Sequence, residues 1–261
     1  MNDFLLNKRT ELAGRTTASQ EKVNILLYGN YGTGKSTILS TCRLPLYVCS
    51  FDPGGTRLKA LEHLRDDGYA ILDTSFEGDI AKTPHALKAL EKTLNDMDRA
   101  KAFDSLGTLA IDSLTTFSDA VMNEILSMRN RAGGHPQIQD YGDLWTIIRN
   151  IVVKCLALPC DFVMTAHVTT AQDEVDGKIY TNLMTLGQSA QKLPTYFDEL
   201  LLAEVQKGKH VIRCKSDGKF KTSTRRFGGE EFETFEEPNI MALRQKAGLT
   251  QDHKPRIGEP K

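Results

Sequence analysis

A short glycine-rich segment near the start of the chain has the residue types needed to hold phosphate groups. Residues 29–36 follow the pattern Gly-x4-Gly-Lys-Ser, with Gly29, Gly34, Lys35 and Ser36 at its fixed positions. Glycines let backbone N–H groups turn toward phosphate oxygens, and a helix that follows directs its positive end at the same anion. Chance produces this pattern in roughly one chain in a hundred of this length. Because an almost continuously apolar stretch precedes it here, we predict a phosphate-binding loop.

Each residue of this loop has an expected role toward ATP and Mg²⁺. Lys35 would reach the β- and γ-phosphates, and Ser36 would bind the metal ion. The predicted nucleotide-binding residues are Gly29, Asn30, Tyr31, Gly32, Thr33, Gly34, Lys35, Ser36 and Thr37.

An acidic residue follows a later apolar stretch, where the second half of such a site is expected. Asp112 comes directly after Leu109-Ala110-Ile111, and we predict that it holds Mg²⁺ through water and contributes to catalysis. The alternative is structural, because Asp112 or Ser113 would also cap a following helix.

Two further residues end apolar stretches and are candidate catalytic groups. Asp52 follows residues 46–51 and is predicted to orient the attacking water; the alternative is a turn aspartate before Pro53. His167 ends residues 163–166 and is predicted to contact the γ-phosphate; the alternative is a bond to backbone. Ligands bind at the carboxyl ends of strands in open parallel sheets, so we expect both side chains at one edge.

Alternating apolar and amphipathic segments predict the fold class, an α/β protein with a mainly parallel sheet flanked by helices. The expected strands are residues 23–28, 46–51, 69–72, 108–111 and 162–166. Helices are expected from residue 35, over 56–65 and 84–103, and around residues 114–125 and 144–155.

The pattern changes after this series. A polar stretch at 169–192 precedes a strand at 197–205, and Lys207-Gly208 and Asp217-Gly218 predict antiparallel hairpins. A last helix is expected at 239–246. We therefore predict a polar N-terminal arm at 1–22, one ATPase domain at 23–249 and a disordered tail at 250–261.

Composition indicates a globular protein without a membrane segment. The chain has 261 residues, 40% of them hydrophobic, and a formal net charge of −1, so any attraction for nucleic acid must be local. Its five cysteines lack the spacing of a zinc set and are expected to be reduced in a cytosolic core. We expect a soluble, cytoplasmic protein that does not bind membranes.

One segment is locally basic. Residues 207–226 carry eight lysines and arginines against one acid, Asp217. Lys209, Arg213 and Lys215 would share one face of a strand, since alternate residues face the same way. This face would bind DNA or a neighbouring subunit, or it would be a solvated edge that prevents aggregation.

These features together resemble the RecA-like ATPases, in particular short phage-encoded recombinases of the single-strand-annealing type. The resemblance covers residues 23–245 and is carried by the segments 29–36, 52–55, 109–113, 141–142, 165–167, 193–199 and 225–228. It implies a RecA-like P-loop core and a homo-oligomer, ring or filament, with ATP between subunits. RecA itself has Glu where Asp52 stands and Gln where His167 stands.

The resemblance also implies sites for partners. Two loops, at about 131–140 and 169–192, would grip single-stranded DNA. Tyr141 and Tyr180 are stacking candidates near these loops, and the alternative is that both tyrosines pack at a loop base. Arg226 would act in catalysis as an arginine finger toward the neighbouring subunit, although the accompanying lysine of that motif is missing.

The expected function is therefore a DNA-stimulated ATPase of recombination or strand annealing, in the cytoplasm of a phage-infected or lysogenic bacterium. Replication or recombination proteins are possible partners. Two alternatives stay open: a nucleotide-gated accessory ATPase without direct DNA binding, and a small-molecule P-loop kinase.

Overall fold

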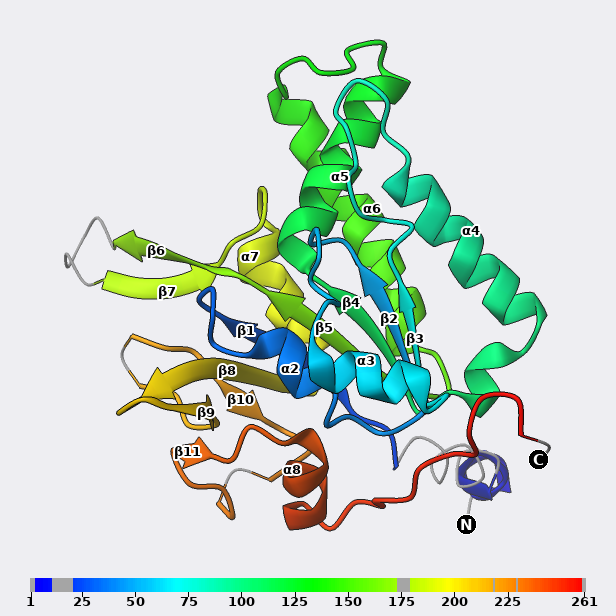
Figure 1. Ribbon diagram of the computed structural model, residues 1–261, viewed down its shortest axis with the longest axis vertical. Coiled ribbons are helices and arrows are strands. Elements are labelled where there is room, and N and C mark those ends of the chain that lie inside the picture. Colours follow the sequence, from blue (N-terminus) through cyan, green and yellow to red (C-terminus); the bar gives the residue numbers. More distant parts are fainter. Residues whose placement is uncertain (1–2, 11–20, 173–178, 218, 229, 260–261) are drawn as a thin grey trace.

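One large mixed sheet organises the chain. In the computed structural model, which describes residues 3–10, 21–172, 179–217, 219–228 and 230–259, the main sheet has nine strands. Eight of them follow the order β11-β9-β8-β1-β5-β4-β2-β3, and β10 pairs with β8. A separate hairpin of β6 and β7 projects to one side (Figure 1).

The six strands from β8 to β3 in that order run parallel, which confirms the predicted fold class. Every residue of β1, β4 and β5 is buried, because helices cover both faces of the sheet. Parallel strands end at the same edge, so the residues after them gather there. Their bounds are β1 Asn24–Gly29, β2 Leu46–Ser50, β3 Ala70–Asp73, β4 Thr108–Asp112, β5 Asp161–Ala166 and β8 Glu199–Gln206.

Antiparallel strands extend the sheet on its C-terminal side, as predicted. The hairpin expected at Asp217-Gly218 is not found among the described residues, because the strands before and after Asp217 both pair with β8 and not with each other. β9 (Lys209–Arg213) pairs with β8 through a two-residue turn. Lys207 and Gly208 in this turn have φ angles of 50° and 79°, the left-handed region expected of such a hairpin. β10 (Ser223–Thr224) and β11 (Phe235–Glu236) are two-residue strands on β8 and β9.

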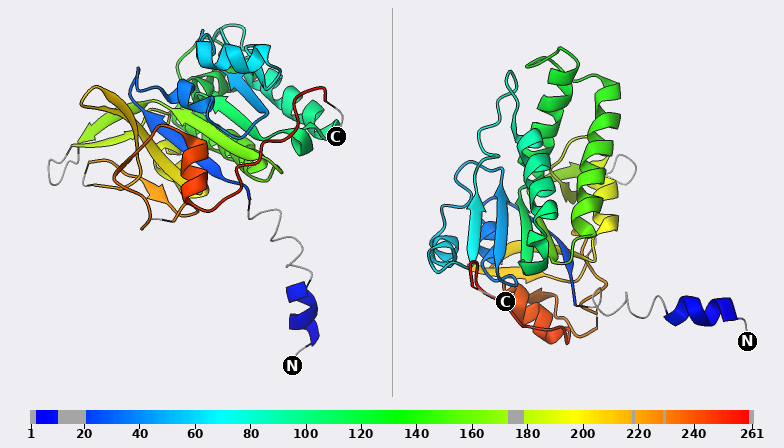
Figure 2. Two further views of the ribbon diagram at one scale, coloured as in Figure 1. Left: turned by 60° about the horizontal axis from the view of Figure 1, so that its bottom comes forward. Right: turned by 90° about the vertical axis from the view of Figure 1, so that its right-hand side faces the viewer.

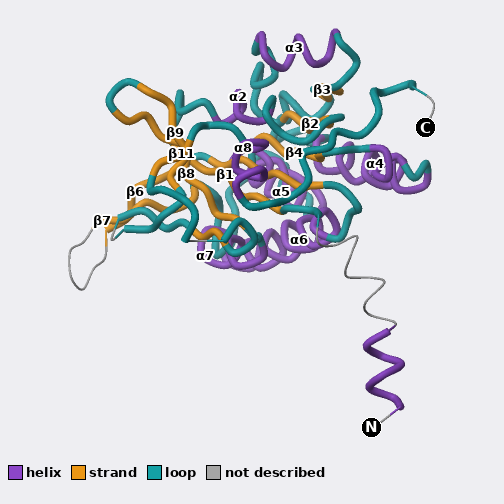
Figure 3. The backbone as a smooth tube through the Cα atoms, turned by 90° about the horizontal axis from the view of Figure 1, so that it is seen from below, coloured by secondary structure: helices purple, strands orange, loops and turns teal. Residues whose placement is uncertain are grey.

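Helices form a layer on each face of the sheet (Figures 2 and 3). One apolar core lies under α4, α5 and α6, and a second lies under α2, α3 and α8. Among the described residues, no helix is long and apolar enough to cross a bilayer. The bounds are α2 Lys35–Leu39, α3 Lys59–Asp66, α4 Ala86–Arg99, α5 Leu114–Met128, α6 Ile138–Leu156, α7 Ser189–Lys192 and α8 Ile240–Lys246.

The region expected to be a polar loop, 169–192, is the main difference from the sequence prediction. It contains β6 (Val168–Gln172), β7 (Ile179–Leu183) and the short helix α7. Its strands carry threonines, which suit extended backbone but lack the apolar alternation that marks a half-buried strand. All five cysteines are buried and free of disulfides, in agreement with the sequence.

The chain ends also differ in detail from the predicted arm and tail. Residues 3–10 form a helix, and Phe4, Leu5 and Leu6 on it are exposed. Residues 251–259, for which the sequence predicts disorder, follow the domain surface. Lys254 N donates to Leu44 O at 2.8 Å, and Ile257 N donates to Gly68 O at 3.2 Å.

A buried ion pair fixes α8 to the amino end of β5. Arg244 is fully buried, and its Nη1 donates to Asp161 Oδ2 at 2.9 Å. Its Nη2 also donates to Glu21 O at 2.7 Å, so this guanidinium joins three distant parts of the chain.

We predict that Arg244→Met lowers the free energy of unfolding by about 3 kcal/mol, because it leaves Asp161 buried without its cation. Urea denaturation measures this change. The matched control is Lys246→Met, on the same helix but paired with Glu236 near the surface, for which a much smaller loss is expected. Equal losses for the two variants would contradict the role given to the buried pair.

Candidate functional site

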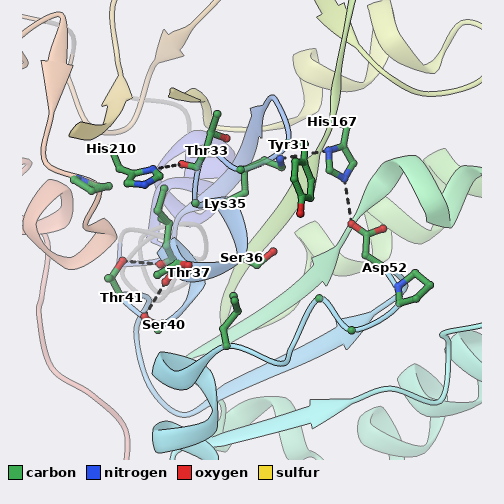
Figure 4. Close-up of a pocket in the computed structure, with 18 residues that line it drawn as sticks. Tyr31, Thr33, Lys35, Ser36, Thr37, Ser40, Thr41, Asp52, His167 and His210 are labelled. Atoms are coloured by element: carbon green, nitrogen blue, oxygen red, sulfur yellow. Dashed lines mark hydrogen bonds and ion pairs between the residues drawn. The ribbon is translucent and has the colours of Figure 1, made fainter. Parts of the chain in front are cut away.

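A cavity of about 830 Å³ opens at the carboxyl edge of the parallel strands. Its lining brings together segments that are far apart in the sequence: the loop after β1, the turn after β2, the residue after β5 and one residue of β9. Figure 4 shows these side chains around the loop, with Asp52 and His167 on one side and His210 on the other.

The predicted phosphate loop has the backbone that its glycines were expected to permit. A Cβ on Gly29 would lie 2.3 Å from Ala203 O on the neighbouring strand, so only glycine fits there. Gly32 and Gly34 have φ angles of 75° and 86°, and α2 begins directly after Gly34. The loop therefore curves between β1 and α2 in a shape that side chains would strain.

Lys35 lies folded against this loop. Its Nζ donates to Gly29 O at 3.0 Å and to Asn30 O at 2.9 Å. Burial lowers the pKa of Lys35, while the charges of Asp112 and Asp52 oppose that shift. The ammonium group is thus bonded to neutral carbonyl oxygens. A polyphosphate bound at this place would bring full negative charges close to it.

Asp112 lies beneath the cavity, at the end of β4. Its Oδ1 accepts a hydrogen bond from Thr165 Oγ1, whereas its buried Oδ2 has no hydrogen-bond partner among the described residues. Burial raises the pKa of Asp112, against the lowering effects of Thr165, Ser36 and Lys35. An unpartnered carboxylate oxygen beside a hydroxyl fits a magnesium site, in which Ser36 and Asp112 would be the protein groups and water would complete the shell.

Asp52 is held by hydrogen bonds on both oxygens. Ser113 Oγ donates to its Oδ1 at 3.0 Å, Thr116 Oγ1 donates to the same atom, and His167 Nε2 lies 3.2 Å from Oδ2. Burial would raise the pKa of Asp52, but the bonds from His167, Thr116 and Ser113 outweigh it and lower the pKa. The carboxylate therefore stays ionised at the edge of the cavity.

His167 joins Asp52 to the phosphate loop. Its Nδ1 lies 3.4 Å from Lys35 Nζ, and an ammonium group can only donate hydrogen bonds. Nδ1 is therefore the acceptor, and the proton on Nε2 is donated to Asp52. The side chains of His167 and Asp52 are 26% and 24% exposed, so both remain open to a ligand in the cavity. The structure thus brings together four of the predicted site residues: Lys35, Asp52, Asp112 and His167.

Sequence reasoning missed the acid that positions the turn after β2. Glu77 accepts hydrogen bonds from Ser50 Oγ at 2.7 Å and from Gly54 N at 3.0 Å. It lies in the loop after β3, and only the pairing of β3 with β2 brings it to this turn. The sequence carries no signal for that contact.

His210 was also missed, because it lies in the middle of a segment that reads as a basic strand. It is in β9, and its Nδ1 lies 3.1 Å from Thr33 O in the phosphate loop. The β8–β9 hairpin therefore contributes a wall of the cavity.

Arg226 does not reach this cavity within the chain. Its backbone N donates to Glu199 Oε1 at 2.5 Å, and Glu199 begins β8, whereas Ala203 further along that strand pairs with Gly29. Arg226 therefore lies near the start of β8, away from the end of that strand that faces the same chain's cavity. Its expected action on a neighbouring subunit stays a prediction.

The predicted DNA-contacting groups are only partly available. Arg213 is buried, bonds Glu204 at 2.8 Å and Asp217 at 2.9 Å, and so is not on an exposed basic face. Arg131, in the loop between α5 and α6, forms an ion pair with Asp140 at 2.7 Å. Lys209 and Lys215 are exposed, as predicted.

The two stacking candidates have different outcomes. Tyr141 is 37% exposed and lies in α6, where its Cδ1 is 3.3 Å from the position of a Cβ on Gly187. This contact favours the packing alternative for Tyr141. The side chain of Tyr180 lies outside the described residues, as do residues 173–178 of the predicted second loop.

A family model described as an AAA domain matches residues 21–226. The chain belongs to this AAA-domain family. The matched range contains the phosphate loop, Asp52, Asp112, His167 and Arg226, and it identifies a P-loop ATPase of the AAA type. Together with the strand order around β1, it confirms the predicted P-loop ATPase core.

Solved structures with a similar arrangement are distant in sequence. A KaiC-like protein from Pyrococcus horikoshii OT3 is 13% identical, with a TM-score of 0.42 over 74% of this chain and 78% of that one. An ATPase of a bacterial type III secretion system is 13% identical, with a TM-score of 0.49 over 73% and 55%. The RadB recombinase is 17% identical, with a TM-score of 0.37 over 73% and 79%. A search of curated proteins found no match.

Asp52 is the residue of this site whose loss should affect hydrolysis more than binding. Asp52→Asn keeps the side-chain shape but removes the carboxylate, so we expect turnover to fall about 100-fold with nucleotide affinity nearly unchanged. Lys35→Ala is the comparison, because losing the ammonium group should abolish turnover and weaken binding. Phosphate release and equilibrium nucleotide binding measure the two effects. Unchanged turnover in Asp52→Asn would contradict its catalytic role.

The turn that carries Arg226 is held by a buried acid, Glu199. Glu199 Oε1 accepts from the backbone N–H groups of Arg226 and Phe227, and burial, opposed by these bonds, raises its pKa from 4.5 to about 8. Between these values the unfolded chain releases a proton that the folded chain keeps. Protonated Glu199 therefore makes its whole contribution to the free energy of unfolding below about pH 4.5. This contribution is lost as the pH rises through 8.

We expect Glu199→Gln, which keeps the accepting oxygen, to flatten the fall of stability between about pH 5 and 8. Urea denaturation at several pH values measures the slope, with a wild-type slope of up to about 1.4 kcal/mol per pH unit from this group. If the variant retained the wild-type slope, Glu199 would not be the group that titrates.

Proposed function

We propose that this AAA-domain protein hydrolyses ATP with Mg²⁺ and uses the cycle to act on single-stranded DNA in recombination or annealing of the phage type. The observation that carries the proposal is a direct link between the cavity and the β6–β7 hairpin. His167, which faces the cavity, is also the residue immediately before β6.

The chemistry of ATP cleavage follows from the groups around the cavity. Lys35 would exchange its bonds to Gly29 O and Asn30 O for bonds to the phosphates, which compensates its burial. Asp52 would accept a hydrogen bond from water and orient it toward the γ-phosphate. Ser36 and Asp112 would hold Mg²⁺, which would supply positive charge against the negative charge of the phosphates.

The hairpin is tied to the site through backbone and hydroxyl groups. His167 N donates to Thr115 Oγ1 at 3.1 Å, and His167 O accepts from Met184 N at 2.8 Å. Thr115 Oγ1 in turn donates to Met184 O at 2.7 Å. A γ-phosphate that moves His167 would therefore move the base of the hairpin, and this coupling supports nucleotide control of DNA binding.

The proposed DNA contacts also use two exposed lysines, one at each end of β9. Lys209 begins β9, and Lys215 follows it after Arg213 and Cys214. Each lysine that neutralises a phosphate would release counterions and make binding depend on salt. We further propose that the active form is a homo-oligomer in which Arg226 faces the nucleotide of a neighbouring subunit.

A second candidate function is favoured by the ion pairs that occupy Arg131 and Arg213. Because these arginines form ion pairs within the chain, fewer positive charges remain to contact DNA. The β6–β7 hairpin would instead contact a replication or recombination protein. This nucleotide-gated accessory role predicts ATP-dependent protein binding without affinity for single strands.

The test is binding of a labelled single strand, measured by fluorescence anisotropy with Mg²⁺ and a slowly hydrolysed ATP analogue. We expect tighter binding with nucleotide than without it. The double variant Lys209→Ala/Lys215→Ala should weaken binding and reduce the magnitude of the slope of log affinity against log salt by about 1.4.

The control is Lys92→Ala/Arg99→Ala, which removes the same charge from exposed positions of α4. It should leave DNA affinity within about twofold of wild type. Absence of binding at low salt in every nucleotide state would reject the DNA role and leave the accessory role.

A further inference from the structure

The cavity continues beyond the phosphate loop, on the side away from Asp52 and His167. Thr41, His210 and Pro238 line this end. Figure 4 shows His210 and Thr41 across the loop from the predicted catalytic pair. A cavity of about 830 Å³ is in the range that encloses a whole small ligand, so it has room for more than phosphates.

The imidazole of His210 has a fixed place over the phosphate loop. Its Nδ1 lies 3.1 Å from Thr33 O, a carbonyl that accepts only, so Nδ1 carries the proton and donates. The same Nδ1 is 3.3 Å from the position of a Cβ on Gly34. The ring is thus oriented by the loop while one side of it faces the cavity.

Pro238 is placed by hydrogen bonds between the start of α8 and the end of α2. Ile240 N donates to Thr41 Oγ1 at 2.9 Å, and Met241 N donates to Thr41 O at 3.1 Å. These bonds hold the segment before α8 against the helix of the phosphate loop. Pro238 itself lies beyond residue 226, where the AAA-domain match ends.

The chemistry of this end suits a flat, uncharged ring. The one carboxylate among the lining residues, Asp52, lies at the opposite end, and Lys35 bonds the loop itself. What remains at this end is an imidazole, a pyrrolidine ring and hydroxyl groups. The imidazole is aromatic and can stack on a nucleobase without regard to which base is present, and the pyrrolidine ring offers an apolar contact.

We propose that His210 and Pro238 form the base-binding wall of the nucleotide site, and that His210 holds the base by stacking. This inference rests on the proposed nucleotide function, because it assigns the nucleoside half of the same cavity.

The test compares ATP with inorganic tripolyphosphate, which has the phosphates but no base, by calorimetric titration of the full chain with Mg²⁺. His210→Asn keeps a donor for Thr33 O but removes the ring, whereas His210→Phe keeps a ring and removes the donor. We expect His210→Asn to lose about tenfold in ATP affinity and His210→Phe to stay within about threefold, with tripolyphosphate affinity unchanged in both. Pro238→Ala should weaken ATP in the same direction.

His63→Asn is the control, since His63 is exposed on α3 and does not line the cavity. The inference is overturned if His210→Asn retains wild-type ATP affinity, if His210→Phe loses as much as His210→Asn, or if wild type binds tripolyphosphate as tightly as ATP. Failure of wild type to bind either ligand would instead overturn the phosphate site, and with it the proposed function. Retained tripolyphosphate binding in each variant shows that the loop is intact.

Discussion

A lysine ammonium group in a partly desolvated loop is the constraint on which the rest of this site depends. Burial disfavours the charge of Lys35, and Asp112 and Asp52 favour it. Backbone carbonyls of the loop satisfy the group without neutralising it. An anion that enters between the loop amides and this ammonium supplies the missing charge, so the protein is built to gain stability from binding a polyphosphate.

Sheet topology decides which acids stand near that lysine. β5 lies between β1 and β4, and β2 follows β4, so residues after three strands meet beside the phosphate loop. Hydrogen bonds then connect them: Asp52 with His167, His167 with Lys35, and Asp112 with Thr165. His167, a member of this network, immediately precedes the β6–β7 hairpin, and the proposed coupling of nucleotide to hairpin rests on this connection.

The sequence predicts what depends on local pattern. The glycine spacing identifies the phosphate loop, and strand-end positions identify Asp52, Asp112 and His167, because parallel strands must end at one edge. It does not predict Glu77 or His210, whose contacts depend on pairing between strands distant in sequence. Arg213 illustrates the opposite error: alternation places it on a basic face, but Glu204, Asp217 and the rings of Phe220 and Phe235 surround it. Only tertiary packing supplies these neighbours.

The most direct test of this account is equilibrium titration of the purified wild-type chain with ATP, with and without Mg²⁺. The account predicts saturable binding of one nucleotide per chain that tightens when magnesium is present. Absence of nucleotide uptake in the presence of magnesium would contradict it, because the loop, Lys35 and Asp112 would then have no phosphate to hold.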